Sequence, residues 1–259
     1  MTILDLIVSD LYAELKFKKQ LIPISQLEHS VLFERTSYSL SERIRNSSSG
    51  IITEHKRRSP SKPNINLNTS IHEVAQGYEK AGASGMSVLT NTKYFGGSLD
   101  DLTLARATTQ LPLLRKEFII DEYQILEAKA YGADAILLIA ACLSRNEIKS
   151  FSETAQKLGL EVLLEVHNQE ELDKAIMPSL NLIGVNNRNL KTFQVSLETS
   201  KQLVDQIPNE FVKISESGIS DISAVKELKK VGFDGFLMGE HFMKTENPGL
   251  SAQQFIQQL

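Results

Sequence analysis

The chain has 259 residues, 41% of them hydrophobic and 23% charged, a balance that excludes a wholly disordered protein and allows a sizeable core. Lysine and arginine number 28 against 32 aspartate and glutamate residues, so the net charge of −4 provides no basic field for a nucleic-acid partner. The single cysteine excludes an internal disulfide and a cysteine-based zinc site, and we expect the protein in the reducing cytoplasm.

The first residues predict a surface helix and not a membrane or export segment. Apolar residues recur at helical spacing over residues 3–21, and Pro23 ends the pattern. Asp5 and Asp10 interrupt the apolar stretch, and no small-residue cleavage site follows it. The segment therefore lacks the features of a secretory signal or a bilayer span, and we expect no membrane partner.

A second, less regular helical stretch is predicted over residues 25–45, before a breaker sequence at residues 47–50. After that point the pattern changes to short apolar runs. We therefore divide the chain into an N-terminal helical extension, residues 1–50, and a larger body on which it packs, residues 51–259.

From residue 51 onward, short apolar runs alternate with longer amphipathic stretches. Such alternation is typical of parallel strands joined by crossover helices, and eight units in about 210 residues fit a single α/β domain, the closed (β/α)8 or TIM barrel. An open doubly wound sheet is the alternative, although no GxGxxG follows any run, which weakens its dinucleotide-binding version. The expected strands are Ile51–His55, Gly85–Leu89, Pro112–Leu114, Ala135–Ala140, Glu161–Val166, Leu182–Val185, Phe211–Ser215 and Gly235–Met238, and the expected helices lie near residues 70–82, 99–108, 121–131, 145–158, 168–176, 196–206, 220–231 and 250–258.

Charged and amide side chains follow several of these strands on the same face as inward-pointing apolar residues. Alternate residues of a strand share a face, so Glu54 lies on the side of Ile52, and Lys116 on the side of Leu114. A single charge beside a strand is usually a solvated loop residue. Unpaired buried charge is costly, however, so charges gathered at one barrel mouth indicate pairing or chemistry. The set comprises Glu54, Lys56, Lys116, Glu165, Asn186, Arg188 and Glu216.

This set can transfer protons on an anionic substrate. A lysine beside another cation has a lowered pKa, and Lys56 and Lys116 are candidates for such a pair. A carboxyl group in a closed pocket has a raised pKa and serves as an acid or a base. The lysines and Arg188 can also bind an anion. Three glutamates and two lysines together favour a multi-step acid–base reaction.

Two glycine turns indicate a phosphate site. Ser217 and Gly218 follow the seventh expected strand, and Gly239 and Glu240 follow the eighth. Barrels often bind phosphate with the loops after these two strands, through backbone N–H groups that glycine leaves accessible. We therefore expect a phosphorylated small-molecule substrate.

Other chemistry-bearing residues favour structural roles. Cys142 ends an apolar run and is interpreted as a small core residue, and His167 as a loop or structural residue. Phe95, Phe118 and Leu137 can form an apolar wall for an aromatic substrate, although such residues more often belong to the core. The five histidines show no HxH or HExxH spacing, so we expect no metal site.

The strand-end sequences resemble those of the indole-3-glycerol phosphate synthase family. The matching strings, in chain order, are IITEHKRRSPS, MSVLTNTKYFGGSLDDL, LPLLRKEFIIDEYQILEAKAYGADAILLIAACLS, LLEVHNQEEL, IGVNNRNLKTF, KISESGIS and FLMGEHFM. The resemblance covers about residues 3–258. It implies a lyase of tryptophan biosynthesis that closes the indole ring of 1-(2-carboxyphenylamino)-1-deoxyribulose 5-phosphate, with loss of carbon dioxide and water and with no cofactor.

The resemblance also implies catalytic roles. Lys116 is similar to the general acid that protonates the ketone oxygen during ring closure, and Glu165 to the acid/base partner in dehydration. Glu54 resembles the carboxylate that assists near the leaving hydroxyl, and Lys56 resembles the partner of the benzoate carboxylate of the substrate. How the lysines and glutamates divide the acid–base steps stays open.

The remaining implied roles are in substrate binding. Asn186 and Glu216 resemble polar groups around the anilino and sugar atoms, and Arg188 resembles a supporting contact. The groups implied for phosphate, mostly through backbone N–H, are Ser59, Ser217, Gly218, Gly239 and Glu240.

Two other functions compete with this reading. Phosphoribosylanthranilate isomerase is another sugar-phosphate barrel, but it relies on a cysteine at the first strand end, where this chain has Glu54. A catalytically idle barrel that serves as a scaffold would have lost members of the acid–base set, all of which are present. We expect a monomer or a weak homo-oligomer.

Overall fold

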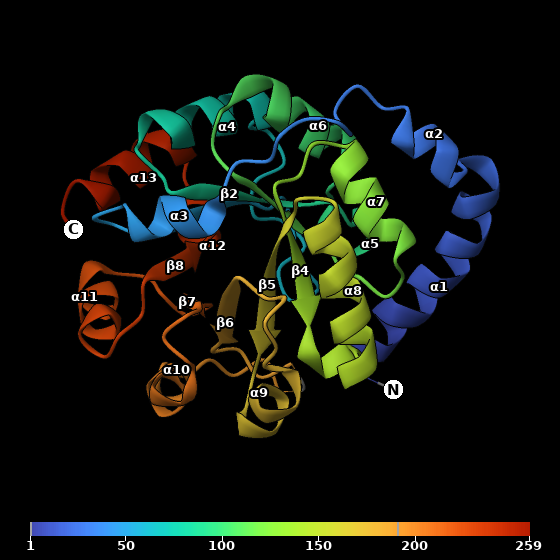
Figure 1. Cartoon of the computed structure of the whole chain (residues 1–259). Coiled ribbons are helices and arrows are strands. Elements are labelled where there is room, and N and C mark those ends of the chain that lie inside the picture. Colours follow the sequence, from blue (N-terminus) through green and yellow to red (C-terminus); the bar gives the residue numbers. More distant parts are fainter. Residues whose placement is uncertain (1, 191) are drawn as a thin grey trace.

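The computed structural model describes residues 2–190 and 192–259; Met1 and Lys191 lie outside the described residues. Eight parallel strands hydrogen-bond in chain order, and β8 pairs with β1 to close a barrel (Figure 1). The predicted TIM barrel is confirmed, and the open doubly wound sheet is wrong. The strands are β1 (Ile51–His55), β2 (Gly85–Leu89), β3 (Leu113–Lys116), β4 (Ala135–Ile139), β5 (Glu161–Val166), β6 (Leu182–Asn186), β7 (Val212–Glu216) and β8 (Gly235–Met238).

Crossover helices return the chain from the end of each strand to the start of the next. Several begin at encoded caps: Ser70 and Ser144 each form a capping box with a glutamate three residues later. The helices are α1 (Ile3–Leu21), α2 (Ile24–Glu28), α3 (Leu40–Arg45), α4 (Ile71–Lys80), α5 (Thr92–Phe95), α6 (Leu99–Thr108), α7 (Tyr123–Ala130), α8 (Arg145–Lys157), α9 (Gln169–Ala175), α10 (Glu198–Leu203), α11 (Ile222–Lys230), α12 (Glu240–Met243) and α13 (Pro248–Ile256), with 3-10 turns η1 (Ala140–Cys142) and η2 (Val204–Gln206).

The observed strands lie within two residues of the predicted ones. The differences matter at the strand ends, because β3 extends to Lys116, β6 to Asn186 and β7 to Glu216. These three side chains therefore stand on the last residue of a strand, where the sheet fixes their direction. The sequence had placed them just beyond the strands.

The predicted helix over residues 25–45 is wrong. Two short helices, α2 and α3, are separated by a non-helical segment. The backbone N–H of Tyr38 donates to Asp134 Oδ1 at 2.7 Å, a bond that an N–H inside a helix cannot make. Ser39 then accepts from the N–H of Glu42 and starts α3 anew.

Helix α3 closes the end of the barrel at which the strands begin. Its Leu40 and Ile44 belong to the core inside the barrel, which is separate from the core between strands and outer helices. Gly85 leaves room for Leu40, because a Cβ there would collide with the leucine. The interior core comprises Leu40, Ile44, Ile52, Leu114, Ala135, Leu137, Ile139, Leu163, Leu182, Val212, Ile214 and Leu237.

Helix α1 lies along the outside of the barrel beside α7 (Figure 1). Ile7, Leu11 and Leu15 are buried against Tyr123 and its neighbours, and Lys18 pairs with the buried Glu127 at 2.5 Å. The first turns of α1 extend to the strand-end mouth. The extension is thus fastened to the barrel by a small core of its own.

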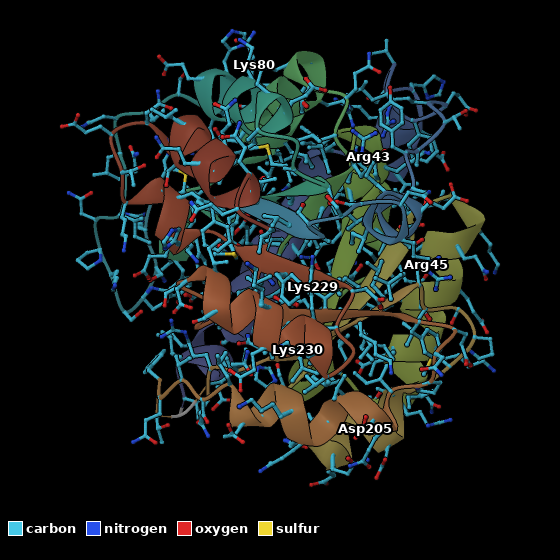
Figure 2. The ribbon with its side chains drawn as sticks, turned by 90° about the vertical axis from the view of Figure 1, so that its left-hand side faces the viewer. Arg43, Arg45, Lys80, Asp205, Lys229 and Lys230 are labelled. Carbon is cyan, nitrogen blue, oxygen red and sulfur yellow. The ribbon has the colours of Figure 1, made fainter. Side chains whose placement is uncertain are left out.

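Several lysine and arginine side chains lie at the strand-start end of the molecule, where the outer helices end (Figure 2). Figure 2 labels Arg43 and Arg45 of α3, Lys80 of α4, and Lys229 and Lys230 of α11, all near the C-terminal ends of their helices. Cations are favoured there by the helix dipole. None of these side chains lies at the mouth where the strands end.

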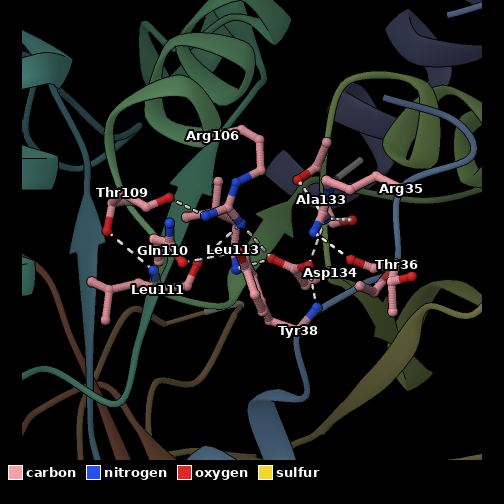
Figure 3. Close-up of polar contacts among 12 residues, drawn as sticks. Arg35, Thr36, Tyr38, Arg106, Thr109, Gln110, Leu111, Leu113, Ala133 and Asp134 are labelled. Carbon is pink, nitrogen blue, oxygen red and sulfur yellow. Dashed lines mark hydrogen bonds and ion pairs between the residues drawn. The ribbon is translucent and has the colours of Figure 1, made fainter. Parts of the chain in front are cut away.

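Asp134 is the polar anchor between the N-terminal segment and the barrel (Figure 3). Its fully buried carboxylate accepts from Arg35 at 2.6 Å, from Arg106 at 2.8 Å, and from the N–H groups of Tyr38 and Leu113. Both guanidinium groups also lie over the ring of Tyr38, at 5.4 and 4.9 Å from its centroid. One carboxylate thus orders two arginines and two backbone segments.

Replacement of this anchor should destabilise the whole fold. In Asp134→Ala the buried Arg106 loses its counter-charge, and we expect the free energy of unfolding to fall by about 3–5 kcal/mol. Chemical denaturation measures the loss. The control is Asp205→Ala, at an exposed position in η2 (Figure 2), which should change stability by less than about 0.5 kcal/mol. Equal effects of the two variants would contradict the anchor.

Candidate active site

The odd-numbered strands carry four long polar side chains into the mouth of the barrel. Two residues earlier on the same face, each of these strands carries a buried apolar residue. These residues are Ile52, Leu114, Leu163 and Ile214. Alternate strands of such a barrel supply residues to a common layer, so the polar set lies directly above an apolar one. The polar set comprises Glu54 of β1, Lys116 of β3, Glu165 of β5 and Glu216 of β7.

Lys116 lies at the centre of this set. Its Nζ is 2.5 Å from Glu216 Oε2 and 3.3 Å from Glu165 Oε2. The lysine side chain keeps 16% of its surface exposed, whereas those of Glu165 and Glu216 keep 5% and 2%. All three side chains line the cavity, and the ammonium group is on the most exposed of them.

A second ion pair stands beside the first. Lys56 Nζ lies 2.6 Å from Glu54 Oε1, and Ser87 donates to the other oxygen of Glu54 at 3.4 Å. On the opposite side, Asn186 donates to Glu165 Oε1 at 3.0 Å, and its own amide oxygen accepts from the N–H of Arg188. The structure thus brings together the charged and amide residues predicted from the strand ends.

The expected pKa of Lys116 is wrong in direction. Burial lowers the pKa, but Glu216, Glu165 and Glu54 outweigh burial, and the pKa stands well above the ordinary lysine value. The prediction weighed the charge of a neighbouring lysine and did not weigh the charges of the three glutamates against it. Lys116 is therefore a charged donor in the free protein.

The three glutamates also differ from one another. Burial, with the negative charge of Glu165, raises the pKa of Glu216 to about 7 in spite of Lys116. Burial also acts on Glu54 and Glu165, but other groups outweigh it and hold the pKa of each below the ordinary value: Lys56 and Lys116 at Glu54, and Lys116 with His167 at Glu165. The predicted raised pKa applies to Glu216 only. Of these three glutamates, two are therefore ionised at neutral pH and the third, Glu216, titrates near neutrality.

The cavity at this mouth has a volume of about 340 Å³ and two unlike sides. Phe95, Phe118 and Leu137 line it, as the sequence suggested for an apolar wall, and the Phe95 and Phe118 rings are 6.1 Å apart. Helix α1 adds Ile3 and Ile7 to the lining. The sequence indicated the amphipathic helix but not that its first turns would border the site.

The expected phosphate-binding residues lie at the other side. Ser217 and Gly218 both adopt left-handed backbone conformations, with φ of 66° and 76°. Asn187, which sequence reasoning missed, donates to the carbonyl of Ser217 at 3.1 Å and to Ser215 at 3.0 Å and so fixes the turn. A serine held at positive φ is strained, a feature typical of functional sites.

The loops after β1 and β8 meet at the same side. Ser59 and Lys62 exchange backbone hydrogen bonds of 2.8 and 3.0 Å, which closes a tight turn after β1. Lys62 forms an ion pair with Glu240, the first residue of α12. Ser59, Gly239 and Glu240 all line the cavity.

Two glycines make room for the carboxylates. A Cβ on Gly184 of β6 would collide with Glu216 Oε1, and a Cβ on Gly239 would lie 2.8 Å from the Glu54 Cβ. Glycine at these positions therefore lets two long acidic side chains lie across neighbouring strands. Sequence alone does not predict this role of Gly184, because it gives no sign of which side chain needs the space.

Within the described ranges, 2–190 and 192–259, no group of three or more His, Cys, Asp or Glu side chains is arranged to hold a metal ion. In that same part of the chain, no helix combines the length and apolarity needed to cross a bilayer.

Comparison with known proteins identifies the family of the chain. The family model described as indole-3-glycerol phosphate synthase matches residues 4–258. The chain belongs to the indole-3-glycerol phosphate synthase family. The synthase of Bacteroides thetaiotaomicron is 48% identical over 98% of this chain and 97% of its own length, and that of Campylobacter jejuni is 43% identical over 95% and 97%. Membership makes the chain a carboxy-lyase of tryptophan biosynthesis, and the resemblance seen in the sequence is confirmed.

Solved structures of low sequence identity share the synthase fold. Thiamine phosphate pyrophosphorylase from Pyrococcus furiosus matches with a TM-score of 0.61 at 16% identity, over 84% of this chain and 98% of its own. KGPDC from Streptococcus mutans matches with a TM-score of 0.58 at 12% identity, over 80% and 97%. These likenesses show the barrel fold alone.

The raised pKa of Glu216 makes the stability of this synthase-family barrel depend on pH. A carboxyl group with a raised folded-state pKa binds its proton more tightly when folded, so the free energy of unfolding falls as pH rises from 4.5 to about 7. We expect the wild type to lose about 3 kcal/mol across this window relative to Glu216→Gln. Denaturation of both proteins below and above the window measures the difference, and parallel stability curves would contradict it.

A methyl group on Gly184 should displace Glu216 from Lys116. We expect Gly184→Ala to keep the fold and to lower kcat about 10–100-fold, because small misplacements of reacting groups are costly. Glu216→Asp provides the matched control, since its shorter side chain does not reach across β6. Adding Gly184→Ala to that variant should cost little more. If the two substitutions lower kcat by independent factors, so that their effects multiply in the double variant, then Gly184 does not act through Glu216.

Proposed function

We propose that the cavity at the strand ends closes the indole ring of 1-(2-carboxyphenylamino)-1-deoxyribulose 5-phosphate and then removes carbon dioxide and water. One observation carries the proposal: the Lys116 ammonium lies within 3.3 Å of two buried carboxylates from other strands and faces the cavity. Cationic, apolar and backbone-donor regions around it match the three parts of that substrate.

The substrate has an anion at each end, and the cavity offers a place for each. The phosphate would lie at the turns of Ser217–Gly218 and Gly239–Glu240, where backbone N–H groups supply donors, with Ser59 beside them. The benzoate carboxylate would pair with Lys56. Its ring would then lie against Phe118 and the other apolar residues of the wall.

Ring closure would use Lys116 as the acid. As the ring carbon attacks the ketone carbon, the ketone oxygen takes a proton from the ammonium and becomes a hydroxyl group. Glu216, 2.5 Å away and with a pKa of about 7, is placed to return a proton to the amine. Asn186 and Arg188 would hold the anilino and sugar atoms nearby.

The later steps ask for less from the protein. Loss of carbon dioxide returns its bonding electrons to the aromatic ring and needs chiefly a dry, correctly placed substrate. Dehydration then removes the hydroxyl as water and a proton from the adjacent carbon. Glu165, ionised in the free protein, is suited to take that proton, and Glu54, which lines the same cavity, would assist the leaving hydroxyl.

The setting of the enzyme is part of the proposal. A phosphorylated metabolite is retained inside cells, and the single cysteine agrees with a reducing compartment, so we infer a cytoplasmic enzyme. We further infer that one chain forms a complete site, because all of the residues named above come from one barrel; a monomer or weak homo-oligomer suffices.

Incubation of the purified protein with the anilino-deoxyribulose phosphate tests the reaction directly. The product contains an indole and the substrate does not, so indole fluorescence should increase with one carbon dioxide released per turnover. An absence of indole product from well-folded protein would favour the scaffold alternative. Turnover of phosphoribosylanthranilate in place of this substrate would favour the isomerase.

Replacement of Lys116 should remove the acid without removing the fold. We expect Lys116→Met, which keeps a chain of similar length, to lower kcat by about 10²–10⁴-fold. The control is Lys149→Met on α8, whose side chain is 65% exposed and remote from the cavity. Circular dichroism checks folding of both. Wild-type turnover by a folded Lys116→Met protein would exclude Lys116 as the acid.

A further inference from the structure

His167 lies directly behind the reacting groups. It follows the last residue of β5, and its ring is held between two carboxylates: Nδ1 is 3.1 Å from Glu171 Oε2, and Nε2 is 3.3 Å from Glu165 Oε1. The side chain is only 11% exposed and does not line the cavity. Any effect of His167 on the reaction must therefore pass through Glu165.

The carboxylate of Glu171 is oriented by hydrogen bonds from groups other than the His167 ring. Its Oε2 accepts the backbone N–H of His167 at 2.9 Å, and its Oε1 accepts from the Asn168 side chain at 3.1 Å. Asn168 in turn caps α9 by accepting from the N–H of Glu171 at 2.9 Å. The start of α9 thus positions one carboxylate against the ring.

Two carboxylates, one near each ring nitrogen, favour the doubly protonated ring. A neutral imidazole carries only one N–H, and its bare nitrogen would repel one of the two carboxylates. Burial lowers the pKa of His167, but Glu165 and Glu171 outweigh burial and raise it to about 10. The ring is therefore a buried imidazolium at neutral pH.

This cation extends a line of alternating charges through the site: Glu171, His167, Glu165, Lys116 and Glu216. Glu165 thus has a cation on either side. The contact with His167 is one of charge, because the buried Nε2–H is not aligned as a hydrogen bond with any acceptor in the described residues. The orienting hydrogen bond to Glu165 comes from Asn186.

We propose that His167, clamped by Glu171, is a positioning residue whose positive charge keeps Glu165 ionised, so that Glu165 enters the reaction as a base. The inference rests on the proposed function. It accounts for a buried ion pair that substrate binding does not need, and it assigns Glu165 and Glu216 to different protonation states within one cavity.

The other titratable groups around the ring are few. Cys142 of η1 feels both glutamates: burial, with the charges of Glu165 and Glu171, raises the pKa of its thiol to about 12, so it stays neutral. Lys174 of α9 is directed to the carbonyl of Leu143 at 3.0 Å. The positive charge that faces Glu165 from this side is therefore that of His167.

Substitutions of His167 separate charge from shape. We expect the acidic limb of the kcat profile to move upward by at least one pH unit in both His167→Ala and His167→Gln. The loss of kcat should be largest on that limb and small at neutral pH, because the pKa of Glu165 starts below the ordinary carboxyl value. KM should change less than about threefold, because the residue does not line the cavity. His167→Lys, which restores a cation, should return the limb toward the wild-type position. The control is His72→Ala on α4, an exposed histidine that contacts Thr108.

The outcomes distinguish this proposal from the proposed function. No indole product from the wild type would refute the function itself. Two results would refute the charge role of His167 and leave the proposed function intact. One is a wild-type pH profile of kcat in His167→Ala, and the other is an acidic limb that returns as fully in His167→Gln as in His167→Lys.

Nitrogen NMR of labelled histidine gives a readout that is independent of turnover. His167 should keep both ring protons up to about pH 9 in the wild type, and should lose one at least one pH unit lower in Glu171→Gln. A ring that titrates in the ordinary range in the folded wild type would overturn the proposal. Glu171→Gln also serves if the His167 variants fail to fold, because it removes the clamp and leaves the ring in place.

Discussion

The structure depends on the pairing of one buried ammonium group. Removing Lys116 from water costs several kcal/mol unless anions replace the lost hydration, and Glu216 and Glu165 supply them. The lysine stands on β3 and its partners on β7 and β5, so the charges meet only if three strands end at one level around a common axis. A closed parallel barrel provides that geometry, and the same contact that satisfies the buried charge places a proton donor at the mouth.

Space is the second constraint on the mouth. Four long polar side chains from the odd-numbered strands cannot converge if the even-numbered strands fill the same volume. Gly184 on β6 and Gly239 after β8 leave it open, and Glu216 and Glu54 lie across them. At the strand-start end, by contrast, the large apolar side chains of Leu40 and Ile44 on α3 fill the interior. The barrel is therefore packed with hydrocarbon at one end and with paired charge at the other.

The two-residue period of a strand explains how much the sequence could predict. Ile52 and Leu114 identified the inward face of their strands. Because alternate residues share a face, Glu54 and Lys116 could be placed on the same face from the sequence alone. Protonation could not be predicted in the same way, because the pKa of Lys116 depends on carboxylates that lie up to 100 residues away in the chain. Residues 29–39 were misread for a similar reason: the bond from the Tyr38 N–H to Asp134 overrides a local helical tendency. The course of α1 past the mouth likewise depends on its packing against Tyr123, which an amphipathic pattern does not specify.

Stability and chemistry are assigned to opposite ends of the same strands. Asp134 precedes β4 at the strand-start end and is satisfied by four donors, so its burial stabilises one arrangement of the N-terminal segment and the barrel. The carboxyl group of Glu216 ends β7 at the other end, and one of its buried oxygens has no hydrogen-bond partner within the described residues. Burial and the negative charge of Glu165 destabilise the ionised form of this carboxyl group and raise its pKa to about 7, where it can exchange a proton near neutral pH. The firm anchor at one end thus allows the protein to keep an unfavourable, reactive charge arrangement at the other.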